Sequence, residues 1–205
     1  SSGNVKLPGW AAAALVVLGA VLRLATLFFL GMDDTPHYFA WGMKANAEGL
    51  ALAYHGIYFP FQWQIFQICA ALCVGLGLPH FVVFKGLTLL CDVGILCALA
   101  RLLDDLGMEP WHSLWFWCHP SFLIFDALGY VDAQFTLAVL ATILLVRRGD
   151  TSADLVLAGI PFGLAFLMKP QVQVLMLAAG SYVVFRGYGR RDWKPAGLLI
   201  VPSLL

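Results

Sequence analysis

Charged side chains are scarce in this 205-residue sequence, at 12%, whereas hydrophobic residues make up 61%. Soluble domains carry about 25% charged residues, so this chain has too little polar surface to solvate a globule. Its formal net charge of zero argues against a nucleic-acid partner. The sequence also lacks a glycine-rich phosphate loop, a dinucleotide fingerprint, an HExxH motif and paired CxxC motifs. Composition therefore predicts a membrane-embedded protein and gives no support to nucleotide or zinc sites.

Apolar runs follow one another along the whole chain. They fall at Trp10–Leu30, Phe61–Leu78, Phe81–Leu103, Trp111–Leu128, Ala133–Val146, Leu155–Met168, Val172–Phe185 and Ala196 onward. A spanning helix needs about 20 residues, so the runs from Ala133 and Leu155 must borrow their flanks. The last run reaches Leu205 without being long enough to cross a bilayer. We therefore expect residues 1–205 to be a single transmembrane module, truncated at its C-terminus. The five cysteines lie within or beside these runs, where packing is a better interpretation than disulfides or metal ligands.

The placement of lysine and arginine chooses between two topologies, because these residues concentrate in cytoplasmic loops. If every run crosses the membrane, Lys6 lies on the opposite side from the arginines after position 100. If Phe61–Leu78 lies in the interface instead, the same arginines share the cytoplasmic side with Lys6. We adopt the second arrangement. It predicts an all-α polytopic protein with about seven transmembrane helices and an external loop, 31–80, that contains two interfacial helices, Pro36–Gly49 and Phe61–Leu78.

Three polar segments gather on the predicted external face, and each has two interpretations. Asp34 and its neighbour Asp33 open the loop, where Asp34 is either a helix cap or, because adjacent carboxylates repel, part of a general-base or cation-binding pair. Asp132 either caps a tight loop or serves the site. Lys169 either snorkels to the interface or meets a phosphate.

Ionisable residues inside apolar runs are costly unless they are paired or face a cavity. Arg23 and Asp92 lie in different runs, and we predict that they form a buried ion pair. Asp126 raises the same question in its own run. Lys85 lies two helical turns before Asp92 on one helix face, so we expect it to point toward the external loop. His37, His55 and His80 are spaced like polar loop residues rather than metal ligands.

Two segments of the external loop resemble the GT-C superfamily of polytopic glycosyltransferases, which use polyprenyl-phosphate sugars. The segment Gly31–Trp41 (GMDDTPHYFAW) is similar to the family's acid after the first helix, with tryptophan seven residues later. That spacing selects Asp34. The segment Tyr58–Phe61 (YFPF) is similar to the Tyr-Pro-Pro-Leu that opens the second loop helix, with Phe59 in place of a proline.

Two later segments extend this resemblance in the same order along the chain. His119-Pro120 followed by Gly129–Asp132 (GYVD) is similar to the family's Asn-Pro and Gly-Gln-x-Asp elements, with His119 and Tyr130 as departures. Leu167–Gln171 (LMKPQ) is similar to the Thr-Lys-Pro-Gln that ends a later helix, with methionine in place of threonine. The resemblance implies a module of seven spanning helices whose first external loop holds two juxtamembrane helices.

The resemblance further implies a mechanism and a set of site residues. Asp34, with Asp33 as the competitor, would take the proton of an acceptor hydroxyl that attacks the anomeric carbon. Lys169, with Lys85 or His80, would meet the phosphate that leaves. The residues expected to contact substrate are His37, Trp41, Tyr58, Gln62, Asp132 and Gln171.

The expected donor is a polyprenyl-phosphate-linked hexose, mannose or glucose, and the acceptor is a glycan or glycolipid hydroxyl. Membrane lipids are the other partners. The site would lie on the external or lumenal side of a bacterial plasma membrane or an endoplasmic reticulum. No metal-ligand set is predicted, although a divalent cation bridging Asp33-Asp34 to phosphate stays open. A lipid or solute transporter, with Arg23, Asp92 and Asp126 along its pathway, is the alternative function, and a non-catalytic membrane scaffold is a third.

Overall fold

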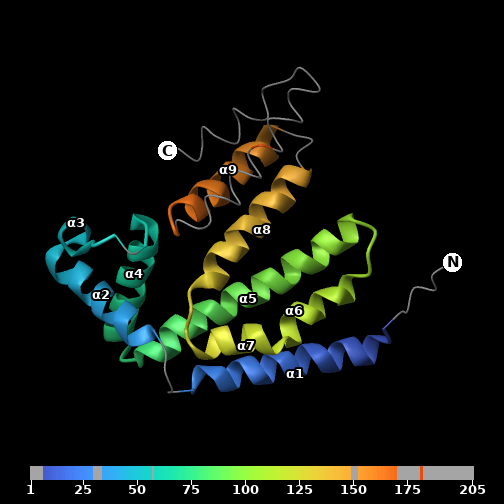
Figure 1. The fold of residues 1–205 in the computed structure, drawn as a ribbon, viewed down its shortest axis with the longest axis horizontal. Coiled ribbons are helices and arrows are strands. Elements are labelled where there is room, and N and C mark those ends of the chain that lie inside the picture. The colour runs from blue at the N-terminus through green and yellow to red at the C-terminus, as the bar shows by residue number, and fades with distance from the viewer. Residues whose placement is uncertain (1–6, 30–33, 57, 149–151, 170–180, 182–205) are drawn as a thin grey trace. The chain divides into compact units, whose positions relative to one another are not determined.

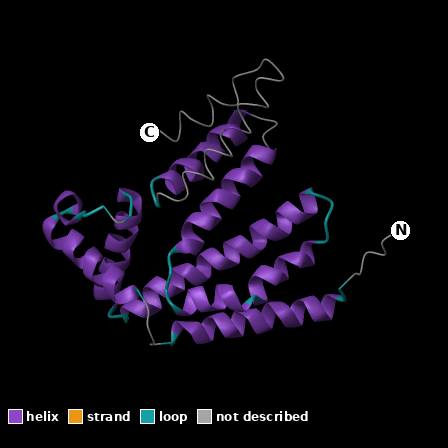
Figure 2. Ribbon diagram, in the orientation of Figure 1, coloured by secondary structure: helices purple, strands orange, loops and turns teal. Residues whose placement is uncertain are grey.

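The computed structural model describes residues 7–29, 34–56, 58–148, 152–169 and 181. Within these ranges the chain forms helices joined by loops, and no strand occurs (Figure 2). The predicted all-α class is therefore confirmed for the described residues. The helices are α1 (Gly9–Leu27), α2 (Thr35–Glu48), α3 (Leu50–Ala53), α4 (Pro60–Leu76), α5 (His80–Asp105), η1 (Pro110–Ser113), α6 (Leu114–Cys118), α7 (Pro120–Ala127), α8 (Asp132–Arg148) and α9 (Ser152–Phe166).

The chain divides into two compact units, each built from two separate stretches of sequence. The first unit comprises Ser1–His37 and Leu72–Ala133, and the second comprises Tyr38–Ala71 and Gln134–Leu205. Each unit therefore depends on contacts between residues that lie far apart in the sequence. Apart from residue 181, the predicted runs Val172–Phe185 and Ala196 onward fall outside the described residues.

Two helices are long and apolar enough to span a membrane. They are α1, with 19 residues, and α5, with 26 residues. Only 11% of the most apolar stretch of α1 is buried within the chain, so its apolar side chains face outward, as expected for contact with lipid. α4 and most of α9 form shorter apolar helices. The seven-helix topology stays a prediction.

The two helices expected in the loop 31–80 are present as α2 and α4. α2 ends one residue before Gly49, whose φ of 88° is a conformation that favours glycine. The chain then forms the short helix α3, which was not predicted, and α4 starts at Pro60. The predicted bounds of both loop helices are thus right to within two residues.

The apolar run Trp111–Leu128 was expected to form one spanning helix, and this prediction was wrong. The run is split into η1, α6 and α7, with a break at His119. The residue before a proline disfavours the α conformation, and His119 is extended, with φ −72° and ψ 128°. The imidazole Nδ1 of His119 then accepts a hydrogen bond from the Ser121 N–H at 3.2 Å, and Pro120 begins α7.

In the first unit, α1 packs along α5, α6 and α7 (Figure 1). Gly19 permits this approach, because a Cβ atom there would overlap the indole of Trp117. The same indole donates its N–H to the Val16 carbonyl at 2.9 Å. Small residues play this part at helix interfaces within membranes.

In the second unit, α2 and α4 come equally close to each other. A Cβ atom on Gly42 would overlap the backbone carbonyl of Phe66. α8 and α9 pack through Val146 and Ala158, with Leu145 and Phe162 against them. Each unit therefore has its own close-packed interior.

Candidate functional site

The segment that carries Asp34 is joined to the loop between α7 and α8. The Asp34 N–H donates to the Leu128 carbonyl at 3.1 Å. Gly129, with φ of 72°, lies so close to Thr35 that an added Cβ atom would stand 2.7 Å from its Cγ2. We call this region, formed by Asp34, Thr35 and residues 127–132, the loop junction. It brings together two of the four family-like segments, almost a hundred residues apart in sequence.

Lys85 lies against the loop junction, and it is buried. Its side chain and backbone together are 2% exposed. The Nζ ammonium donates to the carbonyl of Phe29 at 2.7 Å and to that of Ala127 at 2.8 Å. Two of its hydrogen-bond acceptors are therefore backbone carbonyls of the chain, and neither Phe29 nor Ala127 lies in the predicted loop 31–80.

A buried ion cluster holds α1, α5 and α7 together two turns along α5 from Lys85. Arg23 Nε lies 3.1 Å from Asp92 Oδ2 and 3.4 Å from Asp126 Oδ2. Another guanidinium nitrogen of Arg23 donates to the Trp117 carbonyl, and the guanidinium lies 4.4 Å from the Trp117 ring. The predicted Arg23–Asp92 pair is confirmed. Asp126 is the third member of the cluster. The sequence analysis assigned it no partner, although a carboxylate within an apolar run needs one.

The other two family-like segments are joined in the second unit. The Phe59 N–H donates to the Met168 carbonyl at 3.1 Å, and the Phe61 N–H donates to the Leu167 carbonyl at 3.2 Å. Lys169 follows directly; it is half-buried, and its ammonium lies 5.3 Å from the centre of the Phe135 ring. Two backbone hydrogen bonds thus join the start of α4 to the end of α9, next to Lys169.

An aromatic cluster fills the space between α2, α4 and the loop before α4. Trp41 stacks on Trp63 with ring centres 5.6 Å apart, and Tyr38 stacks on Phe66 at 4.6 Å. The hydroxyls of Tyr38 and Tyr58 lie 3.3 Å apart. The other members are Tyr54 and His55. Two predicted substrate residues, Trp41 and Tyr58, belong to this cluster, and both are half-buried.

Gln62, a third predicted substrate residue, is fully buried and pairs with a side chain on α8. Its Nε2 donates to Gln134 Oε1 at 2.8 Å. Its own Oε1 is buried and has no hydrogen-bond partner among the described residues. A glutamine buried in an apolar helix without a hydrogen-bond partner is energetically costly. That cost was the signal from which the sequence analysis could have predicted the pairing of Gln62 with Gln134, which it missed.

The remaining predicted residues are placed as follows. His37 is exposed on the first turns of α2, His80 is the first residue of α5, and Asp132 begins α8. Asp33 and Gln171 lie outside the described residues. Asp34, Lys85 and Asp132 therefore belong to the first unit, and Trp41, Tyr58, Gln62 and Lys169 belong to the second. In the described ranges no group of three or more histidine, cysteine or acidic side chains is arranged to hold a metal ion.

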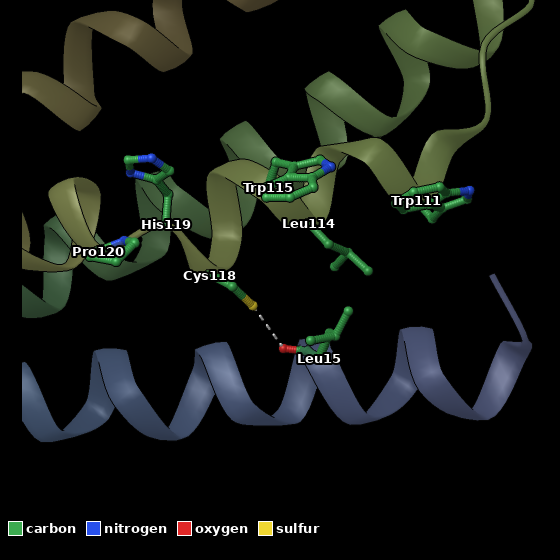
Figure 3. A pocket seen from close by; sticks show the side chains of 7 residues that line it. All are labelled: Leu15, Trp111, Leu114, Trp115, Cys118, His119 and Pro120. Atoms are coloured by element: carbon green, nitrogen blue, oxygen red, sulfur yellow. Dashed lines mark hydrogen bonds between the residues drawn. The ribbon is translucent and has the colours of Figure 1, made fainter. Parts of the chain in front are cut away.

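An apolar pocket of about 250 Å³ lies between α1 and the broken run, and no predicted site residue lines it (Figure 3). Its lining residues are Leu15, Trp111, Leu114, Trp115, Cys118, His119 and Pro120. The Cys118 thiol, at the pocket's edge, lies 3.4 Å from the Leu15 carbonyl. Two of the lining residues, His119 and Pro120, stand at the helix break between α6 and α7.

Comparisons with protein-family models, with curated proteins and with solved structures find no match to this chain.

Proposed function

We propose that this chain is a membrane-embedded glycosyltransferase that moves a sugar from a polyprenyl-phosphate donor to an acceptor hydroxyl. The observation that carries the proposal is the pairing of the four family-like segments. The Asp34 segment meets the Gly129 loop through the Asp34–Leu128 hydrogen bond, and Tyr58–Phe61 meets the Leu167–Lys169 segment through two more. The four segments were chosen for their resemblance alone. They are nevertheless hydrogen-bonded in two pairs, and the members of each pair lie about a hundred residues apart in the sequence.

In the proposed reaction Asp34 takes the proton of the acceptor hydroxyl as its oxygen attacks the anomeric carbon. The bond between that carbon and the phosphate oxygen breaks, and the polyprenyl phosphate leaves with the bonding electron pair. Phosphate departs without protonation, so one base and a cation are enough. Lys169 is the cation that would stabilise the charge developing on the leaving group. Asp33 is the competing base.

The proposed site lies at a membrane face, where the prenyl chain stays in lipid while sugar and acceptor meet in water. Two helices apolar enough to span a membrane support this setting. The proposal includes a multi-pass topology of about seven helices, an external or lumenal site, and a hexose such as mannose or glucose as the transferred group. A divalent cation at Asp33-Asp34 stays part of the proposal only as an accessory to phosphate binding.

A transporter is the second candidate, and one observation favours it: three ionisable groups are buried together on α1, α5 and α7. Arg23 reaches both carboxylates and a backbone carbonyl at once. Such pairing between three helices also explains the cluster as a structural element, so the glycosyltransferase is the better-supported function.

The proposal is tested by sugar transfer from a radiolabelled polyprenyl-phosphate hexose in proteoliposomes. We expect Asp34→Ala to lower kcat by about 10²–10⁴-fold, the usual contribution of a general base. Glu48→Ala is the matched control, because Glu48 is an exposed carboxylate at the other end of α2. Full transfer by Asp34→Ala, by Asp33→Ala and by the double variant would rule out the carboxylate mechanism. Unchanged transfer by Lys169→Met would remove the phosphate role from Lys169.

A further inference from the structure

Lys85 occupies a position that joins the ends of two helices. Phe29 lies just past the C-terminus of α1, and Ala127 is the last residue of α7. Both carbonyls accept from the same ammonium, at 2.7 and 2.8 Å. The final carbonyls of a helix lack partners within the helix and carry the negative end of its dipole. The buried ammonium therefore satisfies the last carbonyl of α7 and, at the same point, a carbonyl of the loop that follows α1.

The Ala127 carbonyl belongs to the loop junction, and the Phe29 carbonyl lies five residues before Asp34 in the sequence. The chain runs from Phe29 to Asp34, and from Ala127 through Gly129 to Asp132. Beyond the ammonium the same two segments meet again in the hydrogen bond from Asp34 N–H to the Leu128 carbonyl. Lys85 thus donates to one carbonyl on each of the two segments.

Gly129 packs against the aliphatic part of the Lys85 side chain. A Cβ atom there would lie 3.5 Å from Lys85 Cε and 2.7 Å from Thr35 Cγ2. Thr35 is completely buried in this contact, and Lys85 is 2% exposed. An ammonium so enclosed is a poor ligand for a lipid-linked phosphate, which would have to displace two carbonyls and the covering loop.

We propose that Lys85 is a positioning residue for Asp34, rather than a ligand of the donor phosphate. This inference rests on the proposed function, in which Asp34 is the base. Lys85 fixes the backbone on both sides of the loop junction, and the Asp34 carboxylate takes its place at the acceptor hydroxyl as a consequence. Lys169 then remains the cation assigned to the leaving phosphate.

Steady-state kinetics separate the two roles of Lys85. Lys85→Met keeps the length of the side chain and removes the ammonium. We expect kcat to fall about 100-fold, the effect of a catalytic group misplaced by about 1 Å, with the KM for the donor unchanged. Inhibition by free polyprenyl phosphate should also stay unchanged. Lys85→Arg, which can donate to both carbonyls, should recover part of the loss. A raised donor KM with weaker phosphate inhibition and an unchanged kcat would overturn the inference.

Thr88→Val is the matched control for these variants. Thr88 is buried one turn further along the same face of α5, and its hydroxyl donates only within the helix, to the Phe84 carbonyl at 3.3 Å. Its removal should leave kcat near the wild-type value. Should Lys85→Met fail to fold, Gly129→Ala displaces the same loop without removing a charge, and it should lower kcat at constant donor KM.

Hydrogen–deuterium exchange of the full chain in lipid nanodiscs tests the inference without sugar transfer. In Lys85→Met, amides in 34–37 and 128–131 should exchange faster, because the Asp34–Leu128 hydrogen bond loses its fixed support. Thr88→Val should leave them unchanged. If the wild-type chain transfers no sugar but exchange rises in Lys85→Met, the proposed function fails while the linkage by Lys85 stands. Unchanged exchange in Lys85→Met would overturn the linkage, whatever the activity.

Discussion

The two units bury polar groups of different kinds. In the first unit, the buried charged residues are Arg23, Lys85, Asp92 and Asp126. In the described part of the second unit, the buried polar side chains are neutral: Gln62, Gln134 and Thr142. The first unit thus holds its helices with ions whose formal charges cancel, whereas the second holds them with an amide pair and stacked rings.

This difference predicts how each unit responds to a single substitution. Removal of one ion leaves an uncompensated charge in an apolar interior, which is costly. Removal of one amide leaves only an unsatisfied dipole. A buried network of ions also has few alternative arrangements, and this restriction suits the unit that carries the proposed base.

The largest expected effect comes from Arg23→Met. This substitution leaves Asp92 and Asp126 buried without a cation at 3.1 and 3.4 Å, and should lower the free energy of unfolding by about 3–5 kcal/mol. Denaturant titration in detergent micelles, followed by tryptophan fluorescence, measures the change. The triple variant Arg23→Met, Asp92→Leu, Asp126→Leu should recover most of the loss. A wild-type stability for Arg23→Met alone would contradict the view that ions hold the first unit.

An intermediate effect is expected from Gln62→Leu in the second unit. Gln134 then loses its donor at 2.8 Å, and the free energy of unfolding should fall by about 1–2 kcal/mol. The double variant with Gln134→Leu should be close to wild type, so a double-mutant cycle should give a favourable coupling energy. If Gln62→Leu costs as much as Arg23→Met, the proposed contrast between ions and neutral amides is wrong.

The smallest effect is expected at the exposed end of α5. Arg101 lies 3.2 Å from Asp104 and 2.9 Å from Asp105, with the arginine side chain half exposed. Arg101→Gln should change stability by less than about 1 kcal/mol. The same titration, repeated at high salt, should reduce even this difference. A loss comparable to that of Arg23→Met would show that burial is not what separates these ion pairs.

Several features of the fold and site followed from the sequence, because they arise from local chemistry or from a strong energetic demand. The loop helices were found from the apolar runs and from the placement of lysine and arginine, and their observed bounds lie within two residues of those predicted. The Arg23–Asp92 pair was found because neither ion is tolerable alone in an apolar helix. The break before Pro120 was missed because hydropathy averages over a run and ignores the backbone conformation that proline imposes.

The parts of the site that the sequence left open depend on long-range geometry. A seven-residue spacing put Lys85 on the same face as Asp92, but only the meeting of α1 and α7 supplies the carbonyls of Phe29 and Ala127. The partner of Gln62 was equally invisible, because its demand for a hydrogen bond does not identify Gln134. Side-chain type thus predicts that a partner exists, and tertiary structure determines which one.

Because Phe59 and Phe61 donate hydrogen bonds to residues at the end of α9, the second unit can be completed only after the first during synthesis of the chain. The first unit is complete in sequence at Ala133, whereas the second needs Met168, 35 residues later (168 − 133). At ribosomal rates of about 5–20 residues per second, Phe59 and Phe61 wait roughly 2–7 s beyond completion of the first unit before Leu167 and Met168 are synthesised. During that interval the Phe59 and Phe61 N–H groups, at the start of α4, lack the carbonyl acceptors that they have in the folded chain.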